Sequence, residues 1–293
     1  MSDEARPLFR AELSATPLAD EYRAQEVALR RCAPAPALFE AARYRPATLE
    51  KLQSLWLGRM KSEYESTAVF VEMARLLMTA GATIDTQAVV LRMAHDELRH
   101  AELCARAVEI LGGEPVMDPQ PPTLQGRAEG CAPEERALRT VIYGCCLSET
   151  INAARFVDAL ETTRDPYMRE LLRQLLADER MHAQFGFLYL EAWRPWLDAH
   201  PEVRERLSRY LEFAFAVLER DLSGSGAAHD PGVPDMDDEE RAAGLPDPQR
   251  LPVTFYATVT GAILPGLDRL GIRATEAWAA RRLEPGRSRP AES

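Results

Sequence analysis

Two short motifs bring acidic side chains and histidines together at a spacing suited to metal binding. They are Asp96-Glu97-Leu98-Arg99-His100 and Asp178-Glu179-Arg180-Met181-His182, and both read D-E-x-x-H. Glu and His three positions apart lie on one face of a helix, so a carboxylate and an imidazole can reach the same ion. The chain has only five histidines. Two chance matches are therefore expected about once in a few thousand such chains.

Each motif also has a carboxylate on the preceding helix at a matching distance from the turn. Glu65 and Glu97 are equidistant from Gly81, in the expected first turn. Glu149 and Glu179 are equidistant from residue 164, in the expected second turn. Residues equidistant from the turn face each other in an antiparallel helix pair, so each hairpin can supply two carboxylates at one level.

The first-helix ligand is the least determined member of this set. Glu63 and Glu72 share the helix with Glu65, and the spacing favours Glu65. A solvated helix face is the alternative interpretation of these acids. Glu149 has no such competitor, because it is the only acid between Glu135 and Asp158.

Four carboxylates and two imidazoles projecting inward from four helices form the ligand set of a di-iron or di-manganese centre. A zinc site more often recruits thiolates or three histidines. Burying four unpaired carboxylates is costly, and two divalent ions neutralise them. The predicted ligands are Glu65, Glu97, His100, Glu149, Glu179 and His182.

Helical periodicity predicts an all-α protein. Helices are expected from about 48 to 80, 85 to 111, 133 to 163 and 166 to 193, with a Pro- and Gly-rich crossover over 112–132. Two antiparallel hairpins joined by a long crossover make a four-helix bundle. We expect an N-terminal extension (1–45) with a helix near 20–31, the bundle (46–195) and a C-terminal helical extension (196–293) broken near Pro265.

The paired motifs resemble those of the ferritin-like di-iron carboxylate superfamily, over about residues 48–193. The resemblance implies that Glu97 and Glu179 bridge the metals, that Glu65 and Glu149 are more terminal, and that each metal has one histidine. It also implies that Asp96 and Asp178 each accept a hydrogen bond from the ligand histidine of the other motif. The cofactor would be two iron ions, with manganese–iron as an alternative and O2 as co-substrate.

Composition limits the partners and the compartment. The net charge is -11 without a basic block, so neither nucleic acid nor an anionic membrane is an expected partner. The first ten residues lack an apolar core, and no run is long enough to span a membrane. Five cysteines without a CxxC pair indicate a cytoplasmic protein and argue against a rubredoxin-type tail.

The leading functional hypothesis is an O2-dependent oxygenase or oxidase that acts on a small organic substrate. About half of the chain lies outside the bundle, which is enough to cover the site and shape a pocket. A separate electron-donor protein and a homodimer are compatible with this hypothesis. The alternatives are a ferroxidase or iron-handling protein, a peroxide reductase, and a metal-free scaffold bundle.

Overall fold

The computed structural model describes residues 9–10, 33–120, 130–223 and 236–282. Its described part is built from helices apart from one pair of two-residue strands, which confirms the all-α prediction. The chain forms two compact units. The first contains 1–127, 159–178 and 236–245, and the second contains 128–158, 179–235 and 246–293.

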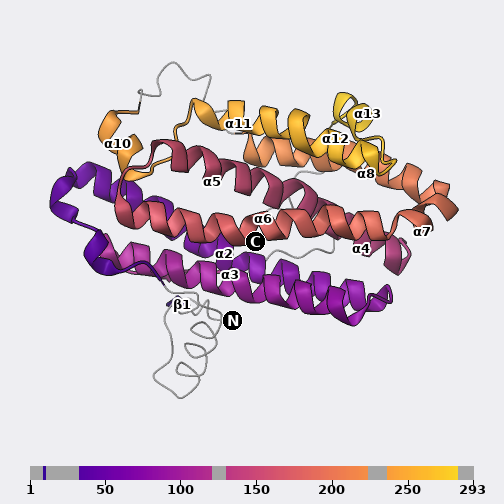
Figure 1. The fold of residues 1–293 in the computed structure, drawn as a ribbon, viewed down its shortest axis with the longest axis horizontal. Coiled ribbons are helices and arrows are strands. Elements are labelled where there is room, and N and C mark those ends of the chain that lie inside the picture. Colours follow the sequence, from indigo (N-terminus) through magenta and orange to yellow (C-terminus); the bar gives the residue numbers. More distant parts are fainter. Residues whose placement is uncertain (1–8, 11–32, 121–129, 224–235, 283–293) are drawn as a thin grey trace, which may run out of the picture. The chain divides into compact units, whose positions relative to one another are not determined.

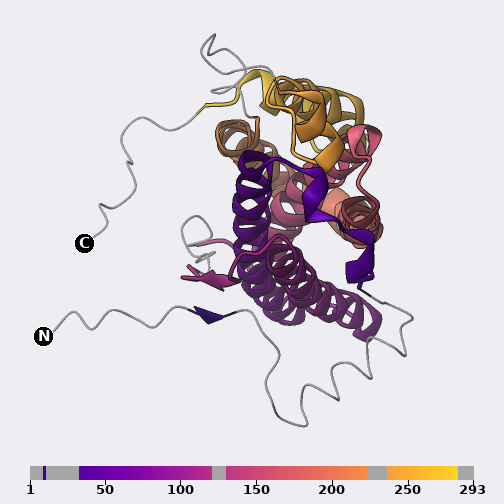
Figure 2. The same cartoon turned by 90° about the vertical axis from the view of Figure 1, so that its left-hand side faces the viewer.

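The first unit is built around a hairpin of two long helices. Helix α2 (Pro46–Thr79) begins with proline at its first turn, and α3 (Ile84–Ile110) returns antiparallel to it (Figures 1 and 2). Gly81 in the connection has a φ of 77°, a left-handed conformation that glycine adopts without steric cost. Apolar side chains on both helices, such as Trp56, Met60 and Met93, are buried.

Several short elements of the first unit precede the hairpin, follow it or pack on it. Strand β1 (Phe9–Arg10) pairs antiparallel with β2 (Val116–Met117). The short 3-10 helices η1 (Pro36–Leu38) and η2 (Ala41–Arg43) precede α2. Helix α10 (Asp238–Ala243) packs on α2, where the Thr48 hydroxyl donates to Glu239 at 2.6 Å.

A single expected helix over 133–163 is interrupted by a wider turn. It consists of α4 (Pro133–Val141), the π-helical segment η3 (Ile142–Glu149) and α5 (Thr150–Thr162). The next helix, α6 (Pro166–Ala192), is unbroken. Its residues up to 178 belong to the first unit, and those from 179 onward belong to the second. Helix α6 is followed in the chain by α7 (Arg194–Ala199) and α8 (Pro201–Leu222).

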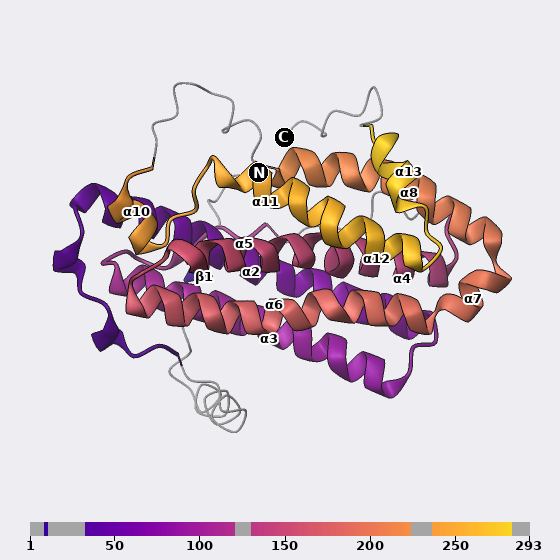
Figure 3. The same cartoon turned by 45° about the horizontal axis from the view of Figure 1, so that its top comes forward.

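The C-terminal helices of the second unit correct one expectation. Helix α11 (Arg250–Thr258), the π-helical segment η4 (Val259–Ile263) and α12 (Leu264–Arg269) follow one another directly (Figure 3). Pro265 does not break the helix, because α12 continues directly from η4 and Pro265 lies within its first turn. The break comes before α13 (Ala274–Ala279), which packs on α8.

Two further expectations concern the ends and the membrane. The helix predicted near 20–31 lies outside the described residues. None of the helices in the described ranges is long and apolar enough to cross a bilayer.

Candidate metal centre

The first motif lies on the inward face of α3. Glu97 is 1% exposed and His100 is fully buried. A buried carboxylate beside a buried imidazole needs charge compensation. One side chain of α2, Glu63, joins them, and ligand atoms of Glu63, Glu97 and His100 lie within 4.8 Å of one another.

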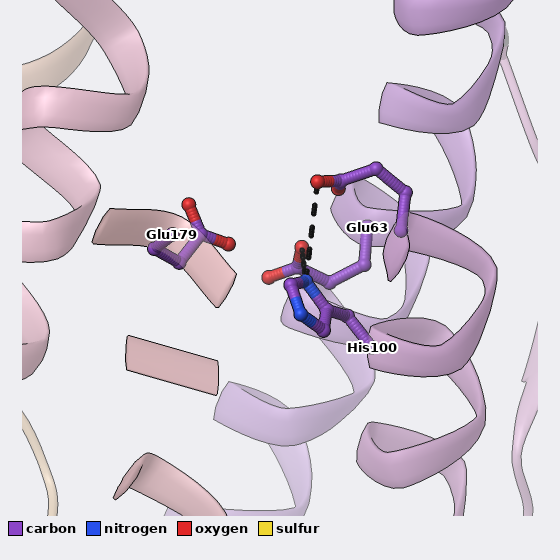
Figure 4. Close-up of side chains that lie close together, drawn as sticks. Glu63, His100 and Glu179 are labelled. Atoms are coloured by element: carbon purple, nitrogen blue, oxygen red, sulfur yellow. Dashed lines mark ion pairs between the residues drawn. The ribbon is translucent and has the colours of Figure 1, made fainter. Parts of the chain in front are cut away.

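The two ring nitrogens of His100 have different neighbours. Its Nδ1 atom lies 3.5 Å from Glu63 Oε2 and 3.9 Å from Glu97 Oε1, whereas Nε2 lies 3.2 Å from Asp178 Oδ2. Figure 4 shows the ion pair between His100 and Glu63. The arrangement is consistent with a proton on Nε2 that is donated to Asp178. In the metal-free protein Nδ1 shares a second proton with Glu63, and a bound metal ion would displace that proton and take the Nδ1 lone pair.

Asp178 is itself held by a buried arginine. Arg99 Nη1 donates to Asp178 Oδ2 at 3.1 Å, and its Nη2 donates to Gln174. The guanidinium charge favours the ionised form of Asp178, which is the better acceptor for His100. The D-E-x-x-H spacing assigns no role to Arg99, and no motif points to Gln174.

The other aspartate of the motifs is also buried. Asp96 is fully buried and accepts a hydrogen bond from Arg92 Nε at 2.7 Å, one turn earlier on α3. The charge of Arg92 therefore offsets part of the cost of burying this carboxylate. The hydrogen bond from His182 to Asp96 stays a prediction of the family resemblance.

Opposing effects act on the Glu63 carboxyl. Burial raises its pKa, whereas the hydrogen bond to His100 and the charges of His100 and Arg59 lower it. The lowering effects prevail, so the pKa of Glu63 lies below its ordinary value. Glu63 is therefore held in the ionised form that a metal ion requires.

Glu65, which the spacing favoured as the first-helix ligand, has different partners. Its Oε1 atom accepts the backbone N–H of Gln120, and Lys61 Nζ lies 3.8 Å from it. Glu65 thus fastens the segment after β2 to α2. Glu72, the third candidate, forms an ion pair with Arg75. The structure brings Glu63, rather than Glu65 or Glu72, to His100.

The second set of acids and histidine belongs to the second unit. Glu149 is 6% exposed, Glu179 is 1% exposed and His182 is fully buried. Ligand atoms of Glu149 and His182 lie within 4.8 Å of each other. Glu149 is the last residue of η3, and π-helical turns occur frequently at functional sites.

The donor atoms of the two sets suit the same kind of ion. Each set offers carboxylate oxygens and one imidazole, which together bind iron or manganese. These side chains have little contact with water, so a bound cation would replace the lost hydration of the carboxylates. The chemistry of the donors therefore fits a di-metal cofactor.

Comparison with known proteins identifies the helical core. The chain matches the rubrerythrin family over residues 59–187, a range that contains both motifs, Glu63 and Glu149. These residues form a rubrerythrin domain. The core of this region is accordingly the ferritin-like bundle of that family, whose members are di-iron carboxylate proteins. No curated protein matches the chain.

The rubrerythrin domain accounts for less than half of the chain. Helices α8, α11, α12 and α13 lie beyond it. Helix α8 packs against α4 and η3, the segments that lead to Glu149. The contact includes an ion pair in which Arg206 Nε lies 2.8 Å from Glu135 Oε2. A helix outside the family region thus supports one that carries a candidate ligand.

Proposed function

We propose that this chain is a non-haem di-iron oxidoreductase that uses O2 to oxidise a small organic substrate. The two sets of acids and histidines would close on one dinuclear centre, with Glu97 and Glu179 as bridging ligands. Glu63 and His100 would complete one metal position, and Glu149 and His182 the other. The burial of these side chains is the observation that carries the proposal.

The burial of the proposed ligands favours a permanently bound metal cofactor over an iron-storage function. A protein that stores iron must let ions enter and leave, whereas the proposed ligands are at most 6% exposed, apart from Glu63 at 13% of its side chain. O2 is small and uncharged, so it can reach a dry site that hydrated ions enter only slowly. Two bound irons would supply electrons and open positions for the reduction of O2.

The residues of the chain would prepare the site rather than react. Asp178 would orient the His100 ring and raise its basicity, and Arg99 would keep Asp178 ionised. The buried apolar side chains of η3 and α6 would keep water away from the bound metal ions. Helix α8, which packs against α4 and η3, would help to enclose a substrate site beside Glu149.

The electrons have to come from outside this sequence or from the substrate. Its five cysteines form no CxxC pair, which a rubredoxin-type electron-transfer site would need. In an oxygenase reaction, one oxygen atom would enter the product and the other would leave as water, with two electrons from a separate donor. In an oxidase reaction, the substrate itself would supply the electrons.

The family match favours peroxide reduction as a second candidate. Anaerobic loading with Fe(II), followed by stopped-flow mixing with O2 or with hydrogen peroxide, separates the two. Rapid oxidation by O2, with a transient visible absorption band, supports the proposal. Oxidation by peroxide with a sluggish O2 reaction favours the peroxidase, and oxidation of many irons per chain into a mineral indicates a ferroxidase.

Substrate oxidation is tested in a second step. Candidate substrates are screened for faster decay of the transient band, and the products are analysed after reaction with isotopically labelled O2. Label in the product identifies an oxygenase, whereas an oxidised but unlabelled product identifies an oxidase. The double variant Glu97→Ala with Glu179→Ala is the control, because it removes both proposed bridging carboxylates.

A further inference from the structure

Gly186 lies where α6 comes closest to the π-helical segment η3. A Cβ atom built on Gly186 would lie 2.7 Å from Cys145 Cβ, 2.7 Å from Cys146 Sγ and 2.9 Å from the Cys146 backbone nitrogen. Carbon atoms in favourable contact are about 3.5–4.0 Å apart. Only glycine therefore fits this position at the observed helix separation.

This contact is one turn away from a candidate ligand on each helix. His182 precedes Gly186 by four residues on α6, and Glu149 follows Cys145 by four residues on η3. Residues four apart on a helix are neighbours on one face. The closest approach of the two backbones therefore lies beside the pair whose ligand atoms are within 4.8 Å of each other, Glu149 and His182.

We propose that Gly186 is a positioning residue for the second metal. Because it has no side chain, α6 and η3 come close enough for Glu149 and His182 to bind the same ion. This inference rests on the proposed di-iron function, and it assigns a role in that function to a residue that cannot itself bind a metal.

The clash created by a methyl group cannot be relieved by rotating a side chain. Two of the three close atoms, Cys145 Cβ and the Cys146 nitrogen, are fixed to the backbone of η3. A full van der Waals contact would separate the helices by about 1 Å. Metal–ligand distances are conserved to about 0.2 Å. A displacement of this size is therefore large enough to break coordination by Glu149 and His182 together.

Three alanine variants separate this role from general destabilisation. Gly186→Ala creates the clash beside the ligands. Gly266→Ala creates a clash of similar size with Phe187, at 2.6 Å, but between α12 and α6. Gly261→Ala lies in the other π-helical segment, η4, and its new Cβ would meet no atom within 4 Å beyond its chain neighbours and its own helix backbone. Alanine is the better helix former throughout, so a weaker helix would not explain a loss of metal.

The full-length wild type and the three variants are titrated anaerobically with Fe(II), and bound iron is counted after equilibrium dialysis. We expect two irons per chain in the wild type, Gly261→Ala and Gly266→Ala. Gly186→Ala should keep one tight iron and bind the second at least about tenfold more weakly. Equal binding of both irons by Gly186→Ala would overturn the inference, as would the same loss in Gly266→Ala.

Hydrogen exchange of the metal-free protein gives a second readout that does not depend on iron. The amides of residues 142–149 should exchange faster in Gly186→Ala than in the wild type and in the two other variants. Unchanged exchange would overturn the proposed contact. A wild type that binds no iron but shows the expected exchange pattern would contradict the di-iron function and the metal role of Gly186, and would leave the packing contact standing.

Discussion

The imidazole of His100 is fixed by Asp178, whose Oδ2 atom lies 3.2 Å from His100 Nε2. The opposite ring nitrogen, Nδ1, faces the carboxylate of Glu63 at 3.5 Å. A histidine that donates one N–H to a carboxylate presents its other nitrogen as a metal ligand in a defined tautomer. Asp178 therefore connects the second motif to the ligand of the first.

Replacing this aspartate should weaken metal binding without removing a ligand. Asp178→Asn keeps an oxygen that can accept the His100 N–H but loses the charge, so we expect the iron affinity to fall by about tenfold. The measurement is competition with a chelator of known affinity. Asp198→Asn is the matched control, because Asp198 pairs with Arg204 at the surface. Equal affinities of the two variants would contradict the role of Asp178.

Glu63 and Glu65 make a direct comparison on one helix. Glu63→Gln should bind one iron fewer than the wild type, because Gln is a much poorer ligand for a hard cation. Glu65→Gln should keep the wild-type iron content, since its carboxylate contacts Gln120 and Lys61. Metal analysis after desalting measures both. The reverse result would restore Glu65 as the ligand.

Glu135 gives a prediction for stability against pH. Burial raises the pKa of its carboxyl, but the hydrogen bond from Arg206 and the charge of Arg139 lower the pKa by more than burial raises it. The pKa of Glu135 therefore lies below its usual value. The stabilising contribution is therefore complete above the unfolded-state pKa of about 4.3 and is lost as the pH falls through the lower folded-state value.

Glu135→Gln should accordingly be less stable than the wild type by about 2 kcal/mol at pH 7. The difference between the two proteins should shrink as the pH falls below about 4.3. Urea unfolding at a series of pH values measures it. A difference that stays constant between pH 7 and pH 3 would show that the charge of Glu135 does not contribute.

The cap of α10 tests the fastening of the hairpin independently of the metal. Asp237 accepts the backbone N–H of Glu240 at 2.9 Å and pairs with Arg45. Asp237→Ala should lower the free energy of unfolding by about 1 kcal/mol and leave the iron content unchanged. Thermal unfolding with parallel metal analysis checks both. A change in iron content would mean that this end of α2 also influences the ligands.

The helices and the motifs could be predicted from the sequence because their signals are local. The expected helix over 85–111 is observed as Ile84–Ile110, and that over 166–193 as Pro166–Ala192. Proline and glycine placed these ends, since each restricts or permits backbone angles at its own position. The D-E-x-x-H spacing likewise needs only the helical repeat to place Glu97 and His100 on one face.

The choice between Glu63 and Glu65 depended on the pairing of two helices. Glu63 lies sixteen residues before Thr79, the end of α2, and His100 lies sixteen residues after Ile84, the start of α3. These two residues therefore face each other across the hairpin. Centring the turn on Gly81 and pairing acid with acid favours Glu65, which is two residues, or about 200° around a helix, from Glu63, the observed neighbour of His100.

The π-helical segment and the role of Gly186 had no local signal. A wide turn within 142–149 depends on which carbonyl each N–H contacts, and the residue types there are compatible with an ordinary helix. Gly186 lies inside a helix, where sequence reasoning assigns glycine only a modest cost. Its importance follows from Cys145 and Cys146, which are about forty residues away in the chain.

The most direct test of the central claim is an anaerobic Fe(II) titration of the full-length protein and of the double variant Glu97→Ala with Glu179→Ala. Bound iron is counted and its electronic state is examined by Mössbauer spectroscopy. The di-iron account predicts two irons per wild-type chain in a coupled pair, and loss of that pair in the variant. A wild type that binds no iron, or a variant that retains the pair, would contradict it.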